Sequence, residues 1–467
     1  MVLVVDVIKG VQTQTAECLI IGEIICSKML VVLNKIDLIP ENKKVATIEK
    51  MSKRMQKTLE STKFAGCPIT AVSANPGASE SDCKEPEGIS NLIQVLQQNT
   101  YVPQRSAEGP FIFSVDHCFS IRGQGTVMTG TVLSGQVCVN NTVEISSVQE
   151  CKKVKSIQMF HKPTQSVKQG DRAGICVTQF DPKLLERGLV CSPGALPTLY
   201  AAIVTLSKIN YFSGEVRTKM KFHVTIGHST VMARIALFGF GDDGTAANHE
   251  SKPLDDAVEG LTVTDMFDFS RDYAYQDELI KGKGLKQWAL LEFEKPVVCR
   301  PNSLVIGSKL DSDIHANKCR LAFRAQIVEA ITDKEYSKML LPKLKVYKNK
   351  TREGAVERIH DDYNVICKGL LKKETDVGLF TGLKVSLSSG EQGLVEGSFG
   401  LSGKVKVRVP TGLSEETKAA LAGKGKKSRK KTAGEPQAII NSEGKVVHVT
   451  MNFKHYVYDP SKKMTQS

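Results

Sequence analysis

The sequence has no feature of a membrane-spanning, secreted or zinc-stabilised protein. No run approaches the roughly 18 consecutive apolar residues that a transmembrane helix needs. The start of the chain is apolar, but Asp6 and Lys9 interrupt it and no basic segment precedes it, so it is not typical of a signal peptide. The 12 cysteines include no Cys-x-x-Cys pair. We therefore expect reduced thiols, a cytosolic chain and no bound structural metal.

The net charge of +13 is unevenly distributed. Residues 341–467 hold 24 Lys and Arg against 13 Asp and Glu, a net of +11, whereas residues 1–340 hold 39 against 37, a net of +2. A basic C-terminal quarter on a nearly neutral body favours a polyanionic partner for that quarter, with nucleic acid as the first candidate. The length predicts about three or four domains.

The first hundred residues alternate between strand-like and helix-like segments. Strands are expected at Met1–Val7, Met29–Leu33 and Pro68–Val72, and helices at Gln12–Ile25, Glu41–Phe64 and from Ile89 onward. This alternation predicts a parallel sheet with right-handed crossovers, which is half of an α/β domain, over residues 1–105.

Strand-like segments dominate after Pro103, and glycine-containing turns recur at short intervals. We expect β-barrels over residues 106–198 and 199–341, and a basic β-rich fourth domain over residues 342–467. The stretch 239–284, rich in Asp, Gly and Glu, is expected to be a flexible insertion in the third domain. A low-complexity basic loop over residues 423–435 interrupts the fourth domain.

The tetrapeptide Asn34-Lys35-Ile36-Asp37 directly follows a predicted buried strand. In open α/β sheets, ligands bind at the carboxyl ends of the strands. A carboxylate at Asp37 can accept hydrogen bonds from both N1–H and the 2-amino group of guanine, and adenine does not present this donor pattern. Such bonds contribute about 1.5–3 kcal/mol each. Asn34 can bond the base and brace neighbouring loops, and the Lys35 stem can pack over the ring.

A second loop, Ser73-Ala74, follows the next strand, and a backbone N–H there could meet the guanine O6. The alternative is that Asn34–Asp37 is a surface turn that needs no ligand. The preceding strand, the following amphipathic helix and the second loop favour a guanine site.

The phosphate-binding motif Gly-x-x-x-x-Gly-Lys-Ser/Thr is absent from the sequence. That loop cradles nucleotide phosphates, and its Ser or Thr holds Mg²⁺. If it supplies four charge-assisted hydrogen bonds, roughly 6–12 kcal/mol of binding is missing. We therefore expect a GTP-binding domain cut at its middle strand, with Val2, Val4 and Ile8 exposed on an unpaired edge.

Several segments support a family resemblance. Val4-Val5-Asp6, Gln12-Thr-Gln-Thr-Ala-Glu17 and Val32-Leu-Asn-Lys-Ile-Asp37 resemble the later half of the GTPase domain of elongation factor Tu-like translational GTPases. The segment 122–135, Arg-Gly-Gln-Gly-Thr-Val-Met-Thr-Gly-Thr-Val-Leu-Ser-Gly, is similar to the second domain of that family.

More specific segments are similar to eukaryotic selenocysteine-specific elongation factors: Ser114-Val-Asp-His-Cys-Phe-Ser-Ile121, Val177–Gly188, Gln287-Trp-Ala-Leu290 and Leu344-Lys-Val-Tyr347. The resemblance covers nearly the whole chain. It implies a P-loop-type G domain, present here only as its C-terminal half, followed by two β-barrels and a fourth domain. It also implies GTP and Mg²⁺ as cofactors.

The family role is to deliver selenocysteinyl-tRNA to the ribosome at recoded UGA codons, together with a SECIS RNA and its binding protein, as a cytoplasmic monomer. The resemblance places Asp116, His117 and Arg172 around the selenocysteinyl group. A selenol is ionised at neutral pH, and Arg172 is always charged. The alternative is a structural Asp116–Arg172 salt bridge beside a solvated His117.

The basic loop contains Lys424, Lys426, Lys427, Arg429, Lys430 and Lys431. It could contact RNA phosphates in a salt-dependent manner, act as a nuclear-localisation-like patch, or simply be solvated. Two functions therefore remain open. One is a GTP-dependent elongation factor, and the other is a non-catalytic RNA-binding fragment of that factor that cannot bind or hydrolyse GTP.

Overall fold

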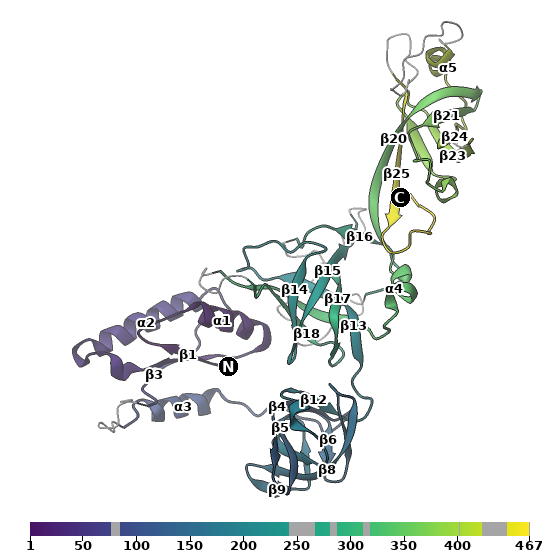
Figure 1. Ribbon diagram of the computed structural model, residues 1–467. Coiled ribbons are helices and arrows are strands. Elements are labelled where there is room, and N and C mark those ends of the chain that lie inside the picture. The colour runs from purple at the N-terminus through teal and green to yellow at the C-terminus, as the bar shows by residue number, and fades with distance from the viewer. Residues whose placement is uncertain are drawn as a thin grey trace. The chain divides into compact units, whose positions relative to one another are not determined.

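The computed structural model describes residues 1–75, 85–241, 267–280, 287–311, 318–400, 402–422 and 446–466 (Figure 1). The chain divides into two compact units. The first comprises Met1–Ala236, Glu278–Gly282 and Trp288–Thr332, and the second Leu237–Asp277, Lys283–Gln287 and Asp333–Ser467. Each unit is described by itself below.

The first unit begins with a parallel sheet in the order β1 (Val2–Asp6), β2 (Leu30–Asn34), β3 (Ile69–Val72). The helices that connect and follow these strands are α1 (Thr13–Ile25), α2 (Lys44–Leu59) and α3 (Ile89–Asn99). The predicted alternation is therefore confirmed. Helix α2 ends before the expected Phe64, because the Thr62 side chain donates to Leu59 O (2.8 Å) and accepts from Phe64 N (3.2 Å), which stabilises a turn.

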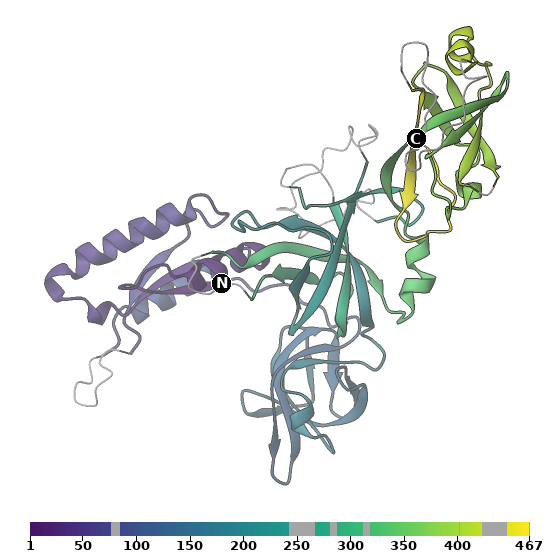
Figure 2. The ribbon, with the colours of Figure 1, turned by 45° about the horizontal axis from the view of Figure 1, so that its top comes forward.

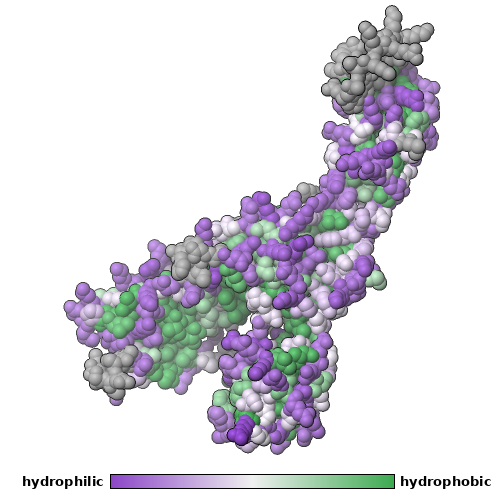
Figure 3. Space-filling view, in the orientation of Figure 1, coloured by the Kyte–Doolittle hydropathy of each residue, from purple (hydrophilic) through white to green (hydrophobic). Residues whose placement is uncertain are grey.

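Strand β1 lies at the edge of this sheet and alternates between buried and exposed residues. Leu3 and Val5 point into the core, whereas Val2, Val4 and Ile8 are 47%, 58% and 57% exposed. The predicted exposure of these three side chains is confirmed. Apolar side chains are also visible on the surface of the α/β part in Figure 3.

A closed barrel follows in the first unit; because it forms the second domain of the chain, we call it the second barrel. Its ring runs β11-β5-β4-β12-β7-β8 and closes by pairing of β8 with β11. The ring strands are β4 (Ile112–Ile121), β5 (Gly125–Ser134), β7 (Thr142–Ile145), β8 (Glu150–Met159), β11 (Arg172–Val177) and β12 (Gly188–Cys191). Shorter elements are β6 (Gln136–Cys138), β9 (Lys162–Thr164), β10 (Ser166–Lys168) and the 3₁₀ helix η3 (Pro182–Leu184). Phe113, Met128 and Ile175 are fully buried in its core.

The next ring runs β14-β18-β19-β13-β17-β15 and closes by pairing of β14 with β15. Its strands are drawn in teal and green in Figure 2. Its strands are β13 (Thr198–Lys208), β14 (Lys221–Ile226), β15 (Ser229–Gly239), β17 (Gln287–Val298), β18 (Leu304–Ser308) and β19 (Leu321–Ile331). The two predicted barrels are thus present.

The expected insertion at 239–284 is not a loop throughout. Strand β16 (Tyr273–Gln276) lies inside it, pairs with β15 and β20, and carries the buried Tyr273. Pairing with strands distant in sequence therefore orders this part of the interval. Residues 242–266 and 281–286 lie outside the described part of the chain.

The fourth domain forms a further closed ring, β20-β21-β24-β23-β22-β25, joined by pairing of β20 with β25. Its strands are β20 (Val346–Asp361), β21 (Asn364–Lys368), β22 (Lys384–Leu387), β23 (Gln392–Phe399), β24 (Lys404–Arg408) and β25 (His448–Tyr456). The helical elements are α4 (Tyr336–Met339), η7 (Leu341–Lys343), η8 (Val377–Phe380) and α5 (Glu415–Ala422).

The helices in the described ranges include none that combines the length and apolar character needed to cross a membrane. The described cysteines are all free thiols.

Candidate functional site

The predicted guanine-binding residues gather at the carboxyl ends of β2 and β3. Asn34 is the last residue of β2, and Asp37 lies one turn later in the 3₁₀ helix η1 (Ile36–Leu38). Ser73 and Ala74 directly follow β3. Since β2 and β3 are parallel neighbours, both loops emerge at the same edge of the sheet.

Two hydrogen bonds join these loops across about forty residues of sequence. The buried Ser73 hydroxyl donates to Asp37 Oδ1 at 2.6 Å. The Ala74 N–H donates to Asn34 Oδ1 at 3.2 Å. Asn34 therefore braces the neighbouring loop, as its amide was expected to do. The Ala74 N–H, considered above as a partner for the guanine O6, has this acceptor in the structure.

Lys35 adopts a left-handed backbone conformation, with φ of 70°, between Asn34 and Asp37. Its Nζ lies 3.0 Å from Asp6 Oδ2, at the end of the neighbouring strand β1. Burial works to raise the pKa of the Asp6 carboxyl, but hydrogen bonds from the Lys9 and Ile8 amides and from Lys35 hold that pKa below its ordinary value. Asp6 is thus an anionic anchor for Lys35.

This arrangement fits a purine base better than it fits a nucleotide phosphate. The Asp37 carboxylate keeps lone pairs beyond the one used by Ser73, so it can still accept from a base edge. Within the described ranges, no group of three or more His, Cys, Asp or Glu side chains could hold a metal ion. The sequence also has no phosphate-loop motif. The oxygen and amide groups at this edge of the sheet are of the kind that can pair with the edge of a guanine base.

A second candidate site lies on the second barrel. Arg172 begins β11, opposite Thr131 of β5, and Asp116 lies where the β4–β5 register shifts. Arg172 Nη1 donates to Asp116 Oδ2 at 2.7 Å and to Thr131 Oγ1 at 3.4 Å. The fold therefore brings together two of the three residues expected around the selenocysteinyl group.

His117 follows Asp116 and is exposed on β4. No hydrogen bond joins it to Asp116 or Arg172 in the described part of the chain. The geometry is that of a barrel salt bridge beside a solvated histidine, and it leaves the guanidinium accessible to a ligand. It is compatible with both interpretations of these residues.

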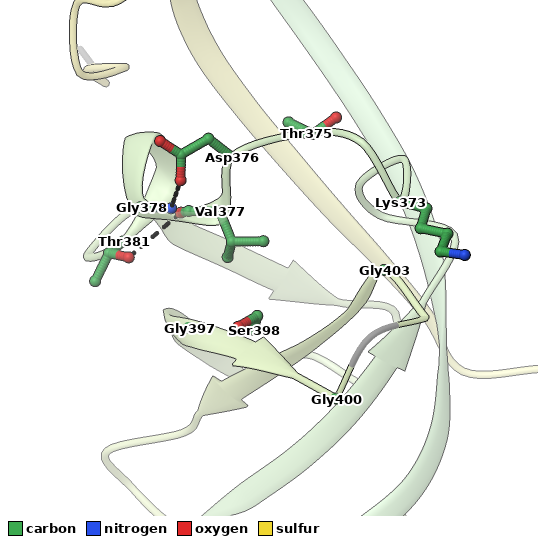
Figure 4. A pocket seen from close by; sticks show the side chains of 10 residues that line it. All are labelled: Lys373, Thr375, Asp376, Val377, Gly378, Thr381, Gly397, Ser398, Gly400 and Gly403. Carbon is green, nitrogen blue, oxygen red and sulfur yellow. Dashed lines mark hydrogen bonds between the residues drawn. The ribbon is translucent and has the colours of Figure 1, made fainter.

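A pocket of about 450 Å³ opens in the fourth domain (Figure 4). Lys373 and Asp376 line it together with the glycines at 378, 397, 400 and 403. The Asp376 carboxylate accepts a hydrogen bond from the Gly378 amide at 2.9 Å and thereby caps the start of η8. The pocket contains none of the predicted site residues. Those of the basic loop, Lys424 to Lys431, lie outside the described residues.

Two residues that support the candidate sites were not predicted from the sequence. Asp6 fixes Lys35, and its position at the end of an apolar strand was the available signal. Thr131 supports Arg172 through a β5–β11 pairing that no local pattern indicates.

Family models match four successive parts of the chain. Residues 1–103 match the elongation factor Tu GTP-binding domain, and residues 125–192 match elongation factor Tu domain 2. Residues 203–325 match the third domain of eukaryotic selenocysteine-specific elongation factors, and residues 342–462 match the eEFSec C-terminal RIFT domain. Together with the fold, these matches define an elongation factor Tu-like translational GTPase class of protein.

Curated relatives narrow this class. The chain is 49% identical over 497 residues to the selenocysteine-specific elongation factor of Mus musculus, covering 100% of this chain and 83% of that protein. It is 26% identical over 405 residues to that of Methanocaldococcus jannaschii, covering 86% of this chain and 75% of that protein. The chain belongs to the selenocysteine-specific elongation factor family.

Two solved structures share the fold. They are translation elongation factor SelB from Methanococcus maripaludis in its apo form, with a TM-score of 0.59, and in complex with the GTP analogue GppNHp, with a TM-score of 0.60. Both are 22% identical to this chain; they cover 98% and 97% of it, and it covers 84% of each.

Proposed function

We propose that this chain binds selenocysteinyl-tRNA and delivers it to the ribosome at recoded UGA codons in a GTP-dependent manner. The observation that carries the proposal is the partly exposed Arg172, held by Asp116 on the second barrel. A fixed guanidinium attracts a selenolate, which is anionic at neutral pH, more strongly than a neutral seryl hydroxyl. His117, next to Asp116, would donate a hydrogen bond to the same anion.

The Asn34–Asp37 loop and the Ser73-Ala74 loop supply the guanine site of this proposal. Asp37 would accept from N1–H and the 2-amino group, with the Ser73 hydroxyl holding the carboxylate in place. Lys35, anchored by Asp6, would cover the base. GTP and Mg²⁺ are the family's cofactors, and the described residues provide for the base alone.

The proposed partners are selenocysteinyl-tRNA and the ribosome, together with SECIS RNA and its binding protein. The chain would act as a monomer in the cytoplasm. The four proposed domains comprise residues 1–105, 106–198, 199–341 and 342–467.

The direct test compares selenocysteinyl-tRNA with seryl-tRNA on the same tRNA body, with and without GTP and Mg²⁺. Filter binding or protection of the ester bond measures the two affinities. We expect tighter binding of the selenocysteinyl form. Equal affinity for the two esters would contradict selenocysteine recognition by this chain.

A second candidate is a non-catalytic RNA-binding form of the factor, supported by the absence of a phosphate-loop motif anywhere in the sequence. It predicts tRNA binding that does not depend on nucleotide, and no phosphate release from GTP. Robust Mg²⁺-dependent GTP turnover by the purified chain would exclude this candidate.

A further inference from the structure

The hairpin between β8 and β9 has an unusual turn in the second barrel (Figure 1). Met159 pairs with Lys162, so the connection consists of only two residues, Phe160 and His161. Their φ angles are +48° and +63°. Positive φ at both central positions is the conformation of a type I′ turn, which strongly prefers Asn-Gly.

Phe160 is poorly suited to this backbone. Left-handed φ is uncommon for residues other than glycine, and for a bulky residue it is an outlier that the surrounding structure must support. The other non-glycine residues at positive φ in the described ranges are Lys, Asn and Gln, apart from His161 itself. The turn therefore has a residue that its local conformation disfavours.

Packing does not account for the choice of phenylalanine. The Phe160 side chain is 80% exposed, and it makes no ring or cation–π contact with the described part of the protein. His161 is exposed as well. An aromatic ring held at a strained tip, without a core to fill, is available to a partner.

The charge around the tip indicates what kind of partner. Residues 150–169, which form the hairpin and its flanks, contain five lysines and a single acid, Glu150. Glu150 is paired with Lys152 at 3.0 Å. Lys162, next to the tip, is exposed. The tip thus presents an aromatic ring beside the exposed Lys162, and further lysines lie along the strands of the hairpin. An aromatic ring near cationic side chains is the combination by which proteins bind unpaired nucleic-acid bases and their phosphates.

We propose that the 159–162 tip is an RNA contact in which Phe160 stacks on an unpaired base while the hairpin lysines neutralise adjacent phosphates. RNA-binding proteins commonly recognise single-stranded loops and ends by stacking unpaired bases on aromatic side chains. The contact is additional to the proposed aminoacyl site at Arg172 and does not require selenocysteine or nucleotide. The RNA is either a tRNA or ribosomal RNA, since both present unpaired bases.

The key variants are Phe160→Ala and the double variant Phe160→Asn/His161→Gly. The first removes the ring. The second removes it and installs the preferred turn residues, so it should unfold roughly 2–6 °C higher if the native turn is strained. Tyr211→Ala is the matched control, because Tyr211 is 52% exposed and has no left-handed backbone.

Binding is measured on full-length protein with a labelled 12-nucleotide single-stranded RNA and a fully paired RNA duplex of equal charge. Both tip variants should weaken single-strand binding about 5- to 100-fold, the range for one lost base–aromatic stack. Duplex binding should stay within about twofold, because phosphate contacts remain. Lys162→Ala should instead weaken the binding of both RNAs. It should also reduce the slope of log affinity against log salt concentration by about one.

Parallel titrations with deacylated tRNA and with purified ribosomes identify the source of the base, since the tip variants should weaken one of them selectively. Tyr211→Ala should change none of these affinities. The proposal is overturned if the more stable Asn-Gly variant binds every RNA as tightly as the wild type, an outcome that would point to a protein partner for Phe160. Selenocysteinyl discrimination should persist in the tip variants, so failure here is separable from failure of the proposed function.

Discussion

Arg172 Nη1 lies 2.7 Å from Asp116 Oδ2, yet the two side chains remain 57% and 33% exposed. A solvent-exposed ion pair typically contributes only about 0–1 kcal/mol to stability. The pairing therefore positions the guanidinium far more than it stabilises the barrel. This relationship makes Arg172 a residue whose functional and structural roles can be separated by measurement.

Arg172→Ala should lower the affinity for selenocysteinyl-tRNA about 10-fold or more, because a charge-assisted contact to an anion is lost. The affinity for seryl-tRNA should fall much less. Arg172→Lys should restore only part of the preference, since an ammonium lacks the planar fork that can bind Asp116 and a ligand together. Competition binding with the two esters measures the ratio.

Arg217→Ala is the matched control for Arg172. Arg217 forms a similarly exposed ion pair with Glu215 at 3.0 Å in the same unit, and it lies in no proposed site. It should leave the preference between the two esters unchanged. Equal losses for both esters in Arg172→Ala would instead show that Arg172 is structural.

In the proposed guanine site, Asp37→Asn should lower the affinity for guanine nucleotides about 10- to 100-fold, because a charged acceptor is removed. The new amide can donate to the 2-oxo group of xanthine, so xanthine nucleotides should lose less affinity or gain some. Ser73→Ala should show a smaller loss with unchanged base preference, because it only frees the Asp37 carboxylate. Fluorescent-nucleotide titration measures both. Equal changes in the affinities for guanine and xanthine nucleotides would show that Asp37 does not recognise the base.

The guanine loops were predictable because a local motif follows a buried strand, and parallel neighbours bring such loops to one edge. The pairing of Asp116 with Arg172 was one of two open interpretations, since the choice depends on the register of β4, β5 and β11. Strand β16 was missed because its order comes from distant partners: β15 and β20 bury Tyr273. Closure of the fourth ring by β20 and β25 likewise joins segments about a hundred residues apart, which no local pattern encodes.

Glu391 should make the fourth domain sensitive to acid. Burial works to raise its pKa, but hydrogen bonds from Ser389, Thr417 and Ser414 lower it to about 2. A depressed carboxyl pKa stabilises the fold fully above the unfolded-state value of about 4.3, and this stabilisation is lost as the pH falls through about 2. After allowance for solvent screening, we expect Glu391→Gln to cost about 1–2 kcal/mol at pH 7.

Chemical unfolding of wild type and Glu391→Gln at a series of pH values checks this expectation. The difference in unfolding free energy should be constant above pH 5 and should shrink towards pH 2, where the native carboxyl becomes protonated. Glu396→Gln is a suitable control, because Glu396 lies on β23 and pairs with Lys406 near the surface. A difference in unfolding free energy that does not vary with pH would show that Glu391 stabilises the domain through packing and not through the charge of its carboxylate.

Cysteine reactivity should separate the exposed thiols from those inside the barrels. Burial raises the pKa of Cys118 to about 11, aided by Asp181, and burial raises that of Cys367 to about 12. At pH 8 an ordinary thiol of pKa about 8.5 is roughly one quarter ionised, whereas one of pKa 11 is about 0.1% ionised. Cys18 and Cys151 are exposed. Because the thiolate is the reactive form, iodoacetamide should modify these two at least about 100-fold faster than Cys118 or Cys367.

Peptide mass spectrometry after timed alkylation gives the rate at each cysteine, and the same reaction in guanidinium chloride gives the unfolded reference. In the denaturant all four thiols should react alike, because the shifts come from burial in the folded state. Cys367 belongs to the core of the ring closed by β20 and β25. Rapid native modification of Cys367 alone would therefore mean that this ring opens independently of the second barrel, where Cys118 would remain protected.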